Sequence, residues 1–401
     1  MQVIKIQDYD YNLPDERIAQ FPLQDRASAK LLIYKQGDIS ENIFANVSDF
    51  IPDDSFLIFN NTKVINARMF FKKKTGAKIE IFCLEPVEMG FEKVFARTEE
   101  CKWNCMVGNA SKWRDEILEK TFSLEGNARK LFAKKIRNTD NGFVIKFYWE
   151  GGCSFSDVMN EAGSTPLPPY IKRPAEDSDR VRYQTVFAEV DGSVAAPTAG
   201  LHFTDNILKS LNAKNIIYDF LTLNVGAGTF KPIKTENVLE HKMHRESFSV
   251  KKNFLEMLLK SIDKNKVAVG TTSVRTLESL YWFGVLPGKV SKDNFVLEQW
   301  EVYGYMNNDL PDAKTSIVNL ISYLEKNDLN VIEGTTSLMI VPDYKFKLVD
   351  TIITNFHLPS STLLLLISAY LGIDWKRVYD FALKNDFRFL SYGDSSILIR
   401  Y

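Results

Sequence analysis

The sequence lacks the features that mark several special classes of protein. Its 50 Lys and Arg residues face 51 Asp and Glu residues, which gives a net charge of -1 at pH 7. The whole molecule therefore has no electrostatic attraction to nucleic acid, and any contact with RNA must come from local patches. It has four cysteines and no Cys-x-x-Cys pair, so we expect free thiols rather than a disulfide framework.

Long apolar runs are also missing. The longest, around residues 363–366, is far shorter than the roughly 20 residues that a membrane span requires. The first eight residues carry charge early and lack the apolar core of a signal peptide. We therefore expect a cytoplasmic protein without membrane association.

The pattern along the chain predicts two interleaved domains. In residues 1–66 and 154–401, short apolar runs such as 56–59 alternate with amphipathic segments, which is typical of an α/β fold. Residues 67–153 instead show period-two alternation with regularly spaced glycines, which is typical of a small antiparallel barrel or sandwich. We predict a mixed-sheet α/β main domain with an inserted small antiparallel β-barrel domain at 67–153. The polar segment 287–335 is interpreted as an elaboration of the main domain.

Local signals place several helices. Pro14 is expected to open a helix that runs through Gln20, because proline is favoured in the first helical turn. A second helix is expected over 155–162, with Gly163 at its end, and Thr204 is expected to cap a third.

Small and polar residues gather where buried strands are expected to end. The run 56–59 ends in Asn60, and a later run ends at Asn355 and His357. Another ends in the Gly-x-Gly of Gly226 and Gly228, a weak nucleotide signal because the full G-x-G-x-x-G spacing is missing. After the strand at 267–270, a hydroxyl-rich turn feeds a helix, an arrangement that can hold a carboxylate or phosphate on backbone N–H groups.

The stretch 193–203, Ser-Val-Ala-Ala-Pro-Thr-Ala-Gly-Leu-His-Phe, has the composition of a pocket floor. Its small residues allow a ligand to approach the backbone closely. It ends at His202, just ahead of the helix that Thr204 is expected to cap. Anionic or acceptor groups of a ligand are favoured at such a helix N-terminus.

All four histidines, His202, His241, His244 and His357, fall at expected element ends rather than inside apolar helices. His241 and His244 are three residues apart, but the spacing is not H-E-x-x-H and no third metal ligand is obvious. A pair of hydrogen-bonded histidines that fixes a loop explains the spacing equally well. A metallohydrolase that uses His241, His244 and His357 remains an alternative at this point.

Cations beside aromatic residues suggest RNA. Lys172 and Arg173 follow the stiff proline-rich segment 166–174, and Arg180 and Arg182 lie shortly after it. This mixture suits an RNA loop with unstacked bases, although a turn packed on the core has the same composition. The basic clusters 72–74 and 129–137 have two interpretations: they contact phosphates, or they form a solvated face without a partner. A non-catalytic RNA-binding protein is therefore a second alternative.

Several long motifs occur together. They include Ala-Ala-Pro-Thr-Ala-Gly-Leu-His-Phe-Thr at 195–204, Gly-Thr-Thr-Ser-Val-Arg-Thr-Leu-Glu-Ser at 270–279, Thr-Asn-Phe-His-Leu-Pro at 354–359 and Arg-Phe-Leu-Ser-Tyr-Gly-Asp at 388–394, with others at 60–68, 166–171, 183–186, 225–230 and 241–246. In this set the chain resembles the S-adenosylmethionine:tRNA ribosyltransferase-isomerase family of queuosine biosynthesis, over nearly its whole length. Asp343 is a departure, because the family usually has glycine there.

The resemblance implies an α/β domain interrupted by a β-barrel. It implies transfer and isomerisation of the ribosyl group of S-adenosylmethionine onto the 7-aminomethyl-7-deazaguanine wobble base of tRNA. The implied products are epoxyqueuosine-tRNA, adenine and methionine. S-adenosylmethionine is then a co-substrate, and neither a cofactor nor a metal is expected. The partners are S-adenosylmethionine and a tRNA anticodon loop, and we expect a monomer.

The expected site residues follow from the same motifs. The four histidines are expected to include a base that removes a proton activated by the sulfonium and an acid that assists departure of adenine. Donor-binding residues are expected at Asn60, Thr198, Gly200, Gly226, Gly228, Thr272, Arg275, Glu278, Asn355 and Asp394.

Overall fold

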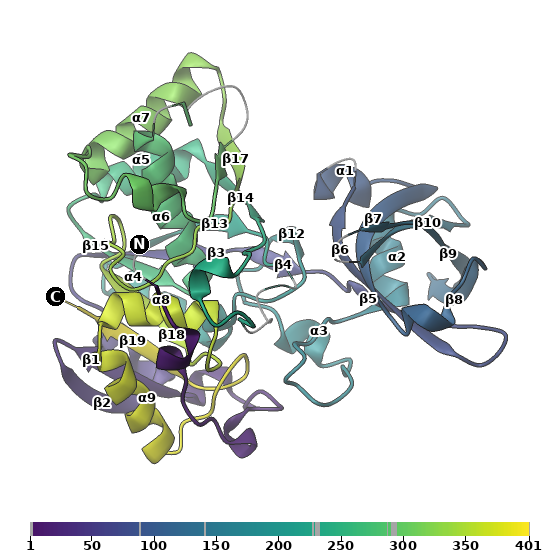
Figure 1. Ribbon diagram of the computed structural model, residues 1–401, viewed down its shortest axis with the longest axis horizontal. Coiled ribbons are helices and arrows are strands. Elements are labelled where there is room, and N and C mark those ends of the chain that lie inside the picture. The colour runs from purple at the N-terminus through teal and green to yellow at the C-terminus, as the bar shows by residue number, and fades with distance from the viewer. Residues whose placement is uncertain are drawn as a thin grey trace.

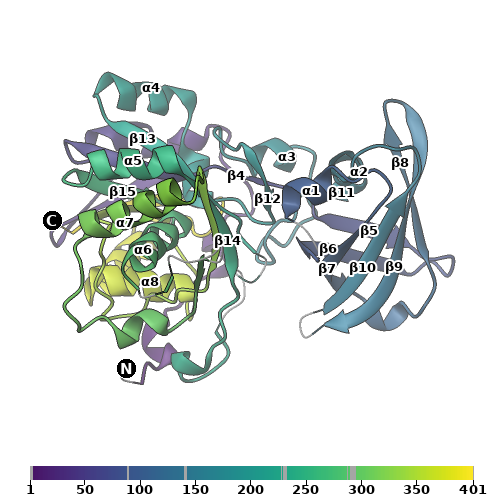
Figure 2. The same ribbon diagram turned by 90° about the horizontal axis from the view of Figure 1, so that it is seen from above.

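The computed structural model describes residues 3–87, 90–139, 142–226, 228, 233–286, 288–289 and 295–400. Two sheets dominate it, a large one surrounded by helices and a smaller, curled one to its side (Figures 1 and 2). The protein therefore has the mixed α/β fold that the sequence predicts. Within the described ranges, every helix is too short or too polar to cross a lipid bilayer.

The large sheet has ten strands. In spatial order they are β16 (Phe295–Leu297), β17 (Val331–Thr336), β14 (Glu246–Lys251), β13 (Ile217–Leu223), β3 (Ser55–Asn60), β15 (Asn265–Val269), β18 (Thr351–Asn355), β19 (Ser395–Ile399), β1 (Lys30–Lys35) and β2 (Asp38–Ile43). The four central strands β13, β3, β15 and β18 run parallel. Their carboxyl ends therefore meet at one edge of the sheet, where open α/β sheets bind ligands.

Helices cover both faces of the large sheet because its central strands are apolar on both sides. Every residue of β3 is buried, and its side chains alternate between two separate cores. One face carries α5 (Lys252–Lys260), α6 (Thr271–Val285), α7 (Ala313–Lys326), α8 (Thr362–Leu371) and α9 (Asp374–Lys384). The other carries α4 (Asp205–Ala213), capped by Thr204 as predicted, and the 3-10 helices Arg26–Ser28, Phe44–Asp49 and Thr198–His202.

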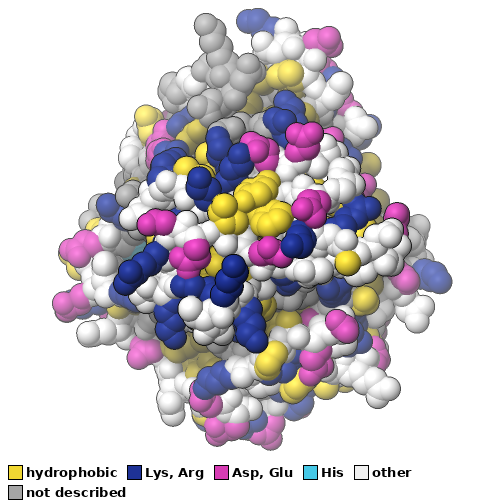
Figure 3. Space-filling view, turned by 90° about the vertical axis from the view of Figure 1, so that its right-hand side faces the viewer, with side chains coloured by type: hydrophobic (Ala, Val, Ile, Leu, Met, Phe, Trp, Pro, Cys, Tyr) yellow, Lys and Arg dark blue, Asp and Glu magenta, His cyan; other side chains and the backbone are white. Residues whose placement is uncertain are grey.

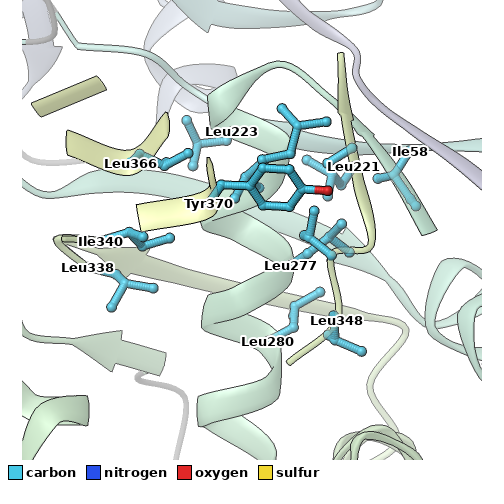
Figure 4. Close-up of a cluster of buried hydrophobic side chains, with 14 of the residues drawn as sticks. Ile58, Leu221, Leu223, Leu277, Leu280, Leu338, Ile340, Leu348, Leu366 and Tyr370 are labelled. Atoms are coloured by element: carbon cyan, nitrogen blue, oxygen red, sulfur yellow. The ribbon is translucent and has the colours of Figure 1, made fainter. Parts of the chain in front are cut away.

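The core under α6 and α8 shows how these layers pack. Leu277 and Leu280 of α6 belong to one hydrophobic cluster with Leu221 and Leu223 of β13 and Tyr370 of α8 (Figure 4). The Tyr370 hydroxyl is not left unpaired, since it donates to the carbonyl oxygens of Asp350 and Leu398. A helix that starts at the carboxyl end of β15 is in this way held rigidly by the core.

The smaller sheet has seven strands, and all neighbours are antiparallel. Their order is β11 (Gly163–Ser164), β5 (Arg68–Lys72), β6 (Lys78–Pro86), β7 (Glu100–Gly108), β10 (Gly142–Trp149), β9 (Asn127–Thr139) and β8 (Leu118–Leu124). The sheet curls so that β5 and β8 come into contact. It carries α1 (Phe91–Phe95) and α2 (Phe155–Ala162), and α2 lies where the sequence predicts a helix. Phe155 packs against the rings of Trp103, Phe147 and Trp149, so α2 belongs to the core of this sheet.

A short neck joins the two sheets. It contains the parallel pair β4 (Thr62–Val64) and β12 (Val190–Ser193), and the short helix α3 (Asp179–Arg182) lies nearby. The side-chain amide of Gln184 accepts from the backbone N–H of Val64 at 3.0 Å and donates to its carbonyl at 2.7 Å, as a neighbouring strand would. The two connections to the smaller sheet also lie side by side, because β11 pairs with β5.

One local expectation needs correction. The helix expected through Gln20 is wrong, because only a 3-10 turn forms at Asp15–Arg17 and the N–H of Ala19 then bonds to the carbonyl of Phe389. In its described part, the elaboration at 287–335 adds β16 and β17 to one edge of the large sheet and α7 to one of its faces. Asp343 has φ of 73°, a left-handed conformation that glycine adopts more easily.

Candidate active site

A cavity lies at the carboxyl edge of β13, β15 and β18. It encloses about 690 Å³ when the open solvent at its mouth is included. Its walls come from segments far apart in the sequence, with lining residues Tyr170, Ala195–Ala199, Val225, Gly270–Thr272, Thr354–Leu358, Ser361, Leu363, Leu390 and Ser391. Among these residues none is Asp, Glu, Lys or Arg, so the described wall of the cavity carries no formal charge when its histidine is neutral.

The segment 195–199 forms one wall, as its composition predicts, and Thr198 lines the cavity. Ser193 fastens this segment to the end of β13: its hydroxyl donates to the carbonyl of Ala195 at 2.6 Å and accepts from the N–H of Val225 at 2.9 Å. Gly200 lies behind the wall, where a Cβ atom would come within 2.9 Å of Phe187. This glycine therefore serves the packing of the wall.

The start of α6 forms a second wall. Gly270 has φ of +89°, which only glycine adopts without strain, and no side chain caps the helix. The Oγ1 atom of Thr272, in a residue that is 9 % exposed, lies beside Gly270 and has no hydrogen-bond partner among the described residues. Uncapped N–H groups and an unused hydroxyl together favour an anionic or acceptor group of a ligand.

Asn355 and His202 form a hydrogen-bonded pair at the end of β18. The Nδ2 atom of Asn355 donates to the carbonyl of Leu390 at 3.0 Å and lies 3.2 Å from Nε2 of His202. Because the carbonyl fixes the amide orientation, Nε2 of His202 is the acceptor. The Oδ1 atom of Asn355 is buried without a partner among the described residues, and Asn355 lines the cavity, whereas His202 does not.

His202 is held as a neutral ring. Burial lowers its pKa to about 4, although Asp394 and a hydrogen bond to the backbone of Arg26 oppose this shift. The ring also packs against Phe44, with centroids 5.0 Å apart. The His202 ring, fixed in this way, helps to hold Asn355 in position. The ring itself lies behind the cavity wall.

His357 is the one histidine among the lining residues of the cavity. Its Nε2 atom lies 3.1 Å from the hydroxyl of Thr354, and its backbone N–H donates to the hydroxyl of Tyr379 at 3.1 Å. Burial lowers its pKa to about 3. The ring is therefore neutral at pH 7 and can accept a proton at a nitrogen that faces polar neighbours.

His241 and His244 do not line the cavity. They follow the 3-10 turn Val238–Glu240 and lie outside any helix or strand. Gly226 and Gly228 lie against His244, and a Cβ atom on Gly228 would fall 1.7 Å from the ring. Ala227 and residues 229–232 of this predicted motif lie outside the described residues. No three His, Cys, Asp or Glu side chains of the described chain gather closely enough to hold a metal ion.

Two further predicted donor-binding residues hold the ends of strands. Asn60 accepts from the N–H of Leu223 at 3.0 Å and donates to its carbonyl at 2.9 Å, so it ties β3 to the end of β13. Asp394 accepts from the N–H groups of Lys30 and Arg388 at 3.0 and 2.7 Å, which shapes the turn before β19. Neither residue lines the cavity.

Arg275 and Glu278 lie deeper in α6, also away from the cavity lining. Arg275 is 3 % exposed and pairs through Nη1 with Glu246 at 2.7 Å, while Nε and Nη2 have no partner among the described residues. Glu278 is fully buried, and burial raises its pKa although hydrogen bonds oppose this. It accepts from the hydroxyl of Tyr344 and from three consecutive N–H groups at 347–349, which fixes that loop.

The structure adds lining residues that the sequence did not single out. Tyr170 and Ser391 meet across the cavity wall, with their hydroxyl oxygens 2.6 Å apart. Leu390 lines the cavity at φ of 70°, an unusual conformation that lets its carbonyl accept from both Asn355 and Gly393. Tyr170 and Ser391 belong to the motifs at 166–171 and 388–394, so the sequence contained a signal for their place near the site. No sequence signal indicates the conformation of Leu390.

The chain is similar to known proteins over its whole length. It is 38 % identical to the S-adenosylmethionine:tRNA ribosyltransferase-isomerase of Sulfurihydrogenibium sp., covering 99 % of this chain and 100 % of that protein. It is 37 % identical to the protein of the same name from Halothermothrix orenii, with 99 % and 100 % covered. The crystal structure of S-adenosylmethionine tRNA ribosyltransferase from Thermotoga maritima matches with a TM-score of 0.47 and 25 % identity, covering 98 % of this chain and 100 % of that one.

The model of one protein family, described as queuosine biosynthesis protein, matches residues 6–398. The match includes every segment that lines the cavity, and it agrees with the resemblance that the motifs indicate. The chain belongs to the queuosine biosynthesis protein family.

Proposed function

We propose that this protein transfers and isomerises the ribosyl group of S-adenosylmethionine onto the 7-aminomethyl-7-deazaguanine wobble base of a tRNA. The products are epoxyqueuosine-tRNA, adenine and methionine. The observation that carries the proposal is the similarity, over 98–99 % of the chain, to relatives named S-adenosylmethionine:tRNA ribosyltransferase-isomerase. The cavity supports it, because segments of several of the family motifs line it together at the carboxyl edge of the large sheet.

The polar groups of the cavity suggest how the donor lies. The carboxylate of S-adenosylmethionine is placed at the uncapped start of α6, beside Thr272, where backbone N–H groups and an unused hydroxyl are available. The Oδ1 atom of Asn355 is free to accept from a donor group elsewhere on the same ligand. The sulfonium then lies among uncharged side chains, with no cation on the described wall to repel it.

His357 is the proposed base of the reaction. A sulfonium acidifies the adjacent C5′–H bond, and a neutral imidazole can accept that proton. His357 lines the cavity and is neutral at pH 7 because burial depresses its pKa to about 3. His202 is proposed to position Asn355 instead, because its ring forms hydrogen bonds with Asn355 and with the backbone of Arg26.

The smaller sheet is proposed as an inserted barrel-like domain, residues 67–153 with α2 and β11 packed into it, that contacts tRNA. Residues 67–153 contain 17 Lys and Arg against 12 Asp and Glu, whereas the rest of the chain has 33 against 39. Lys134, Lys146 and Lys102 are cross-strand neighbours on β9, β10 and β7. Glu100 pairs with Lys146 at 2.5 Å and so offsets part of the positive charge of this row. Basic side chains surround an apolar patch on this end of the molecule, with acidic ones among them (Figure 3).

Of the cations expected to contact tRNA near the neck, two are already paired. Arg173 binds Asp179 through two hydrogen bonds of 2.7 and 2.8 Å, and Lys172 binds Asp15 at 2.6 Å. Arg180 and Arg182 form no ion pair among the described residues, so they are the better candidates.

The test is release of free adenine. Purified protein is incubated with S-adenosylmethionine and a tRNA that carries the precursor base, and adenine is measured by chromatography. We expect His357→Gln to reduce adenine release at least about a hundredfold while donor binding persists. Lys73→Ala serves as the control, because Lys73 pairs with Glu116 on the smaller sheet and should affect tRNA binding only slightly. Absence of adenine with the unaltered protein would refute the proposed function.

A further inference from the structure

A second hollow adjoins the cavity and shares Ser391 with it. Its lining includes Arg26, Arg182, His202 and Arg388, and it encloses about 300 Å³ including its mouth. The three arginines come from the 3-10 helix before β1, from α3 and from the turn before β19. Chain segments more than 150 residues apart thus bring three guanidinium groups to one place beside the donor cavity.

The charges of this hollow are not balanced by the protein. Arg388 pairs with Asp394 at 3.2 Å, but neither Arg26 nor Arg182 forms an ion pair among the described residues. Asp25 precedes Arg26 in the sequence, but its carboxylate accepts hydrogen bonds from the N–H of Ala27 and the hydroxyl of Ser28. His202 contributes no charge, since burial lowers its pKa to about 4. The local sum is therefore positive.

The guanidinium groups are held in place by backbone carbonyls. Arg26 donates through Nη1 to the carbonyl of Gln184 at 3.0 Å. Arg182 donates to the carbonyls of Gln24 and Leu23. Such bonds fix the side chains and leave their positive charge in place. Burial and the nearby charge of Arg182 lower the pKa of Arg26, which shows that the two cations repel each other.

We propose that this hollow binds a phosphodiester of the RNA backbone, next to the nucleotide whose base enters the cavity. The inference rests on the proposed function and adds a site to it. An anion relieves the repulsion between the arginines, and the planar guanidinium forks match phosphate oxygens. An enzyme that acts on a base usually takes it out of the stack, so the phosphates beside that nucleotide come close to the active site. Ser391, common to both hollows, marks the short path between them.

The first experiment uses a synthetic anticodon stem-loop with the precursor base. In two variants of this RNA, one phosphodiester flanking the wobble nucleotide, on its 5′ or its 3′ side, is a neutral methylphosphonate. We expect one of the two changes to weaken binding to the unaltered protein about tenfold or more. Equal affinity for all three RNAs overturns the proposal, and this result does not depend on any protein variant folding.

The second experiment combines the RNA with protein variants in a double-mutant cycle. Arg26→Gln and Arg182→Gln should each weaken binding of the unmodified stem-loop roughly tenfold and reduce its dependence on salt concentration. In these protein variants, the methylphosphonate that weakens binding to the unaltered protein should weaken binding little further, because the RNA change and the protein change remove the same contact. Full and additive losses overturn the proposal.

Controls separate the anion from other sources. Arg377→Gln removes an exposed arginine of α9 that pairs with Asp374, and it should bind the stem-loop normally. Binding of S-adenosylmethionine by Arg26→Gln should also be unchanged. A loss of donor binding without a loss of RNA binding would assign the hollow to the donor carboxylate and overturn the proposal. If the unaltered protein binds the stem-loop but releases no adenine, the proposed function fails while the phosphate site stands.

Discussion

Acid should destabilise this protein through two buried histidines. His202 and His357 are at most 8 % exposed, and burial lowers their pKa values to about 4 and about 3. In the unfolded chain both return to a pKa of about 6.5. Between these values the unfolded chain binds more protons than the folded one. Stability is therefore present above pH 6.5 and is lost as the pH falls towards 4.

The size of the loss follows from the same shifts. Each histidine contributes a slope of about 1.4 kcal/mol per pH unit below pH 6.5, so the pair contributes roughly 2.7 kcal/mol per unit. At pH 5 each has cost about 2 kcal/mol relative to pH 7, and together about 4 kcal/mol. That is a large part of the 5–15 kcal/mol by which proteins are typically stable.

Urea titrations at pH 7, 6 and 5 would measure this effect. The variant His357→Gln removes one of the two groups, so below pH 6.5 its free energy of unfolding should fall less steeply than that of the unaltered protein, by about 1.4 kcal/mol per pH unit. Carboxylates titrate equally in both proteins, and their contribution cancels in the comparison. The reasoning is refuted if the two proteins show the same dependence on pH between 7 and 5.

Three further changes test other parts of the structure. Thr272→Val should raise the KM for S-adenosylmethionine about tenfold in steady-state assays, whereas Ser273→Ala, whose hydroxyl bonds to the carbonyl of Val269, should not; equal effects would contradict a carboxylate site at α6. Glu278→Gln should cost roughly 3 kcal/mol in urea unfolding, because its amide cannot satisfy all the donors at 344–349, and a neutral result would contradict this role. Gly228→Ala should lower the thermal midpoint, since its Cβ would overlap a histidine ring, whereas the nearest atom to a Cβ on Gly226 is 3.7 Å away; equal midpoints for both variants would contradict the contact.

The sequence predicted the strands of the large sheet well where local chemistry decides them. Apolar runs that end in small or polar residues became β3, β15 and β18, and the segments after β15 and β18 line the cavity. The family was also correctly identified from its motifs. Such features depend on residues close together in the chain, so the pattern alone reveals them.

The division of labour within the motifs could not be predicted. The sequence motifs predict Asn60, Glu278 and Asp394 as ligand-binding residues. In the structure, their side-chain oxygens accept hydrogen bonds from backbone N–H groups of the protein itself. His202 and His357 look alike in the sequence, but only His357 lines the cavity. These roles depend on partners far away in the sequence, such as Leu223 for Asn60 and Lys30 for Asp394, which no local pattern encodes.

The neck between the two sheets has a geometric consequence for the RNA. Paired strands and the clamp that Gln184 forms on Val64 make this connection a rigid bracket, unlike a flexible tether. The span between the lysine row and the arginine hollow is then a built-in length. Under the proposed function, an RNA that contacts both surfaces at once must match this fixed span.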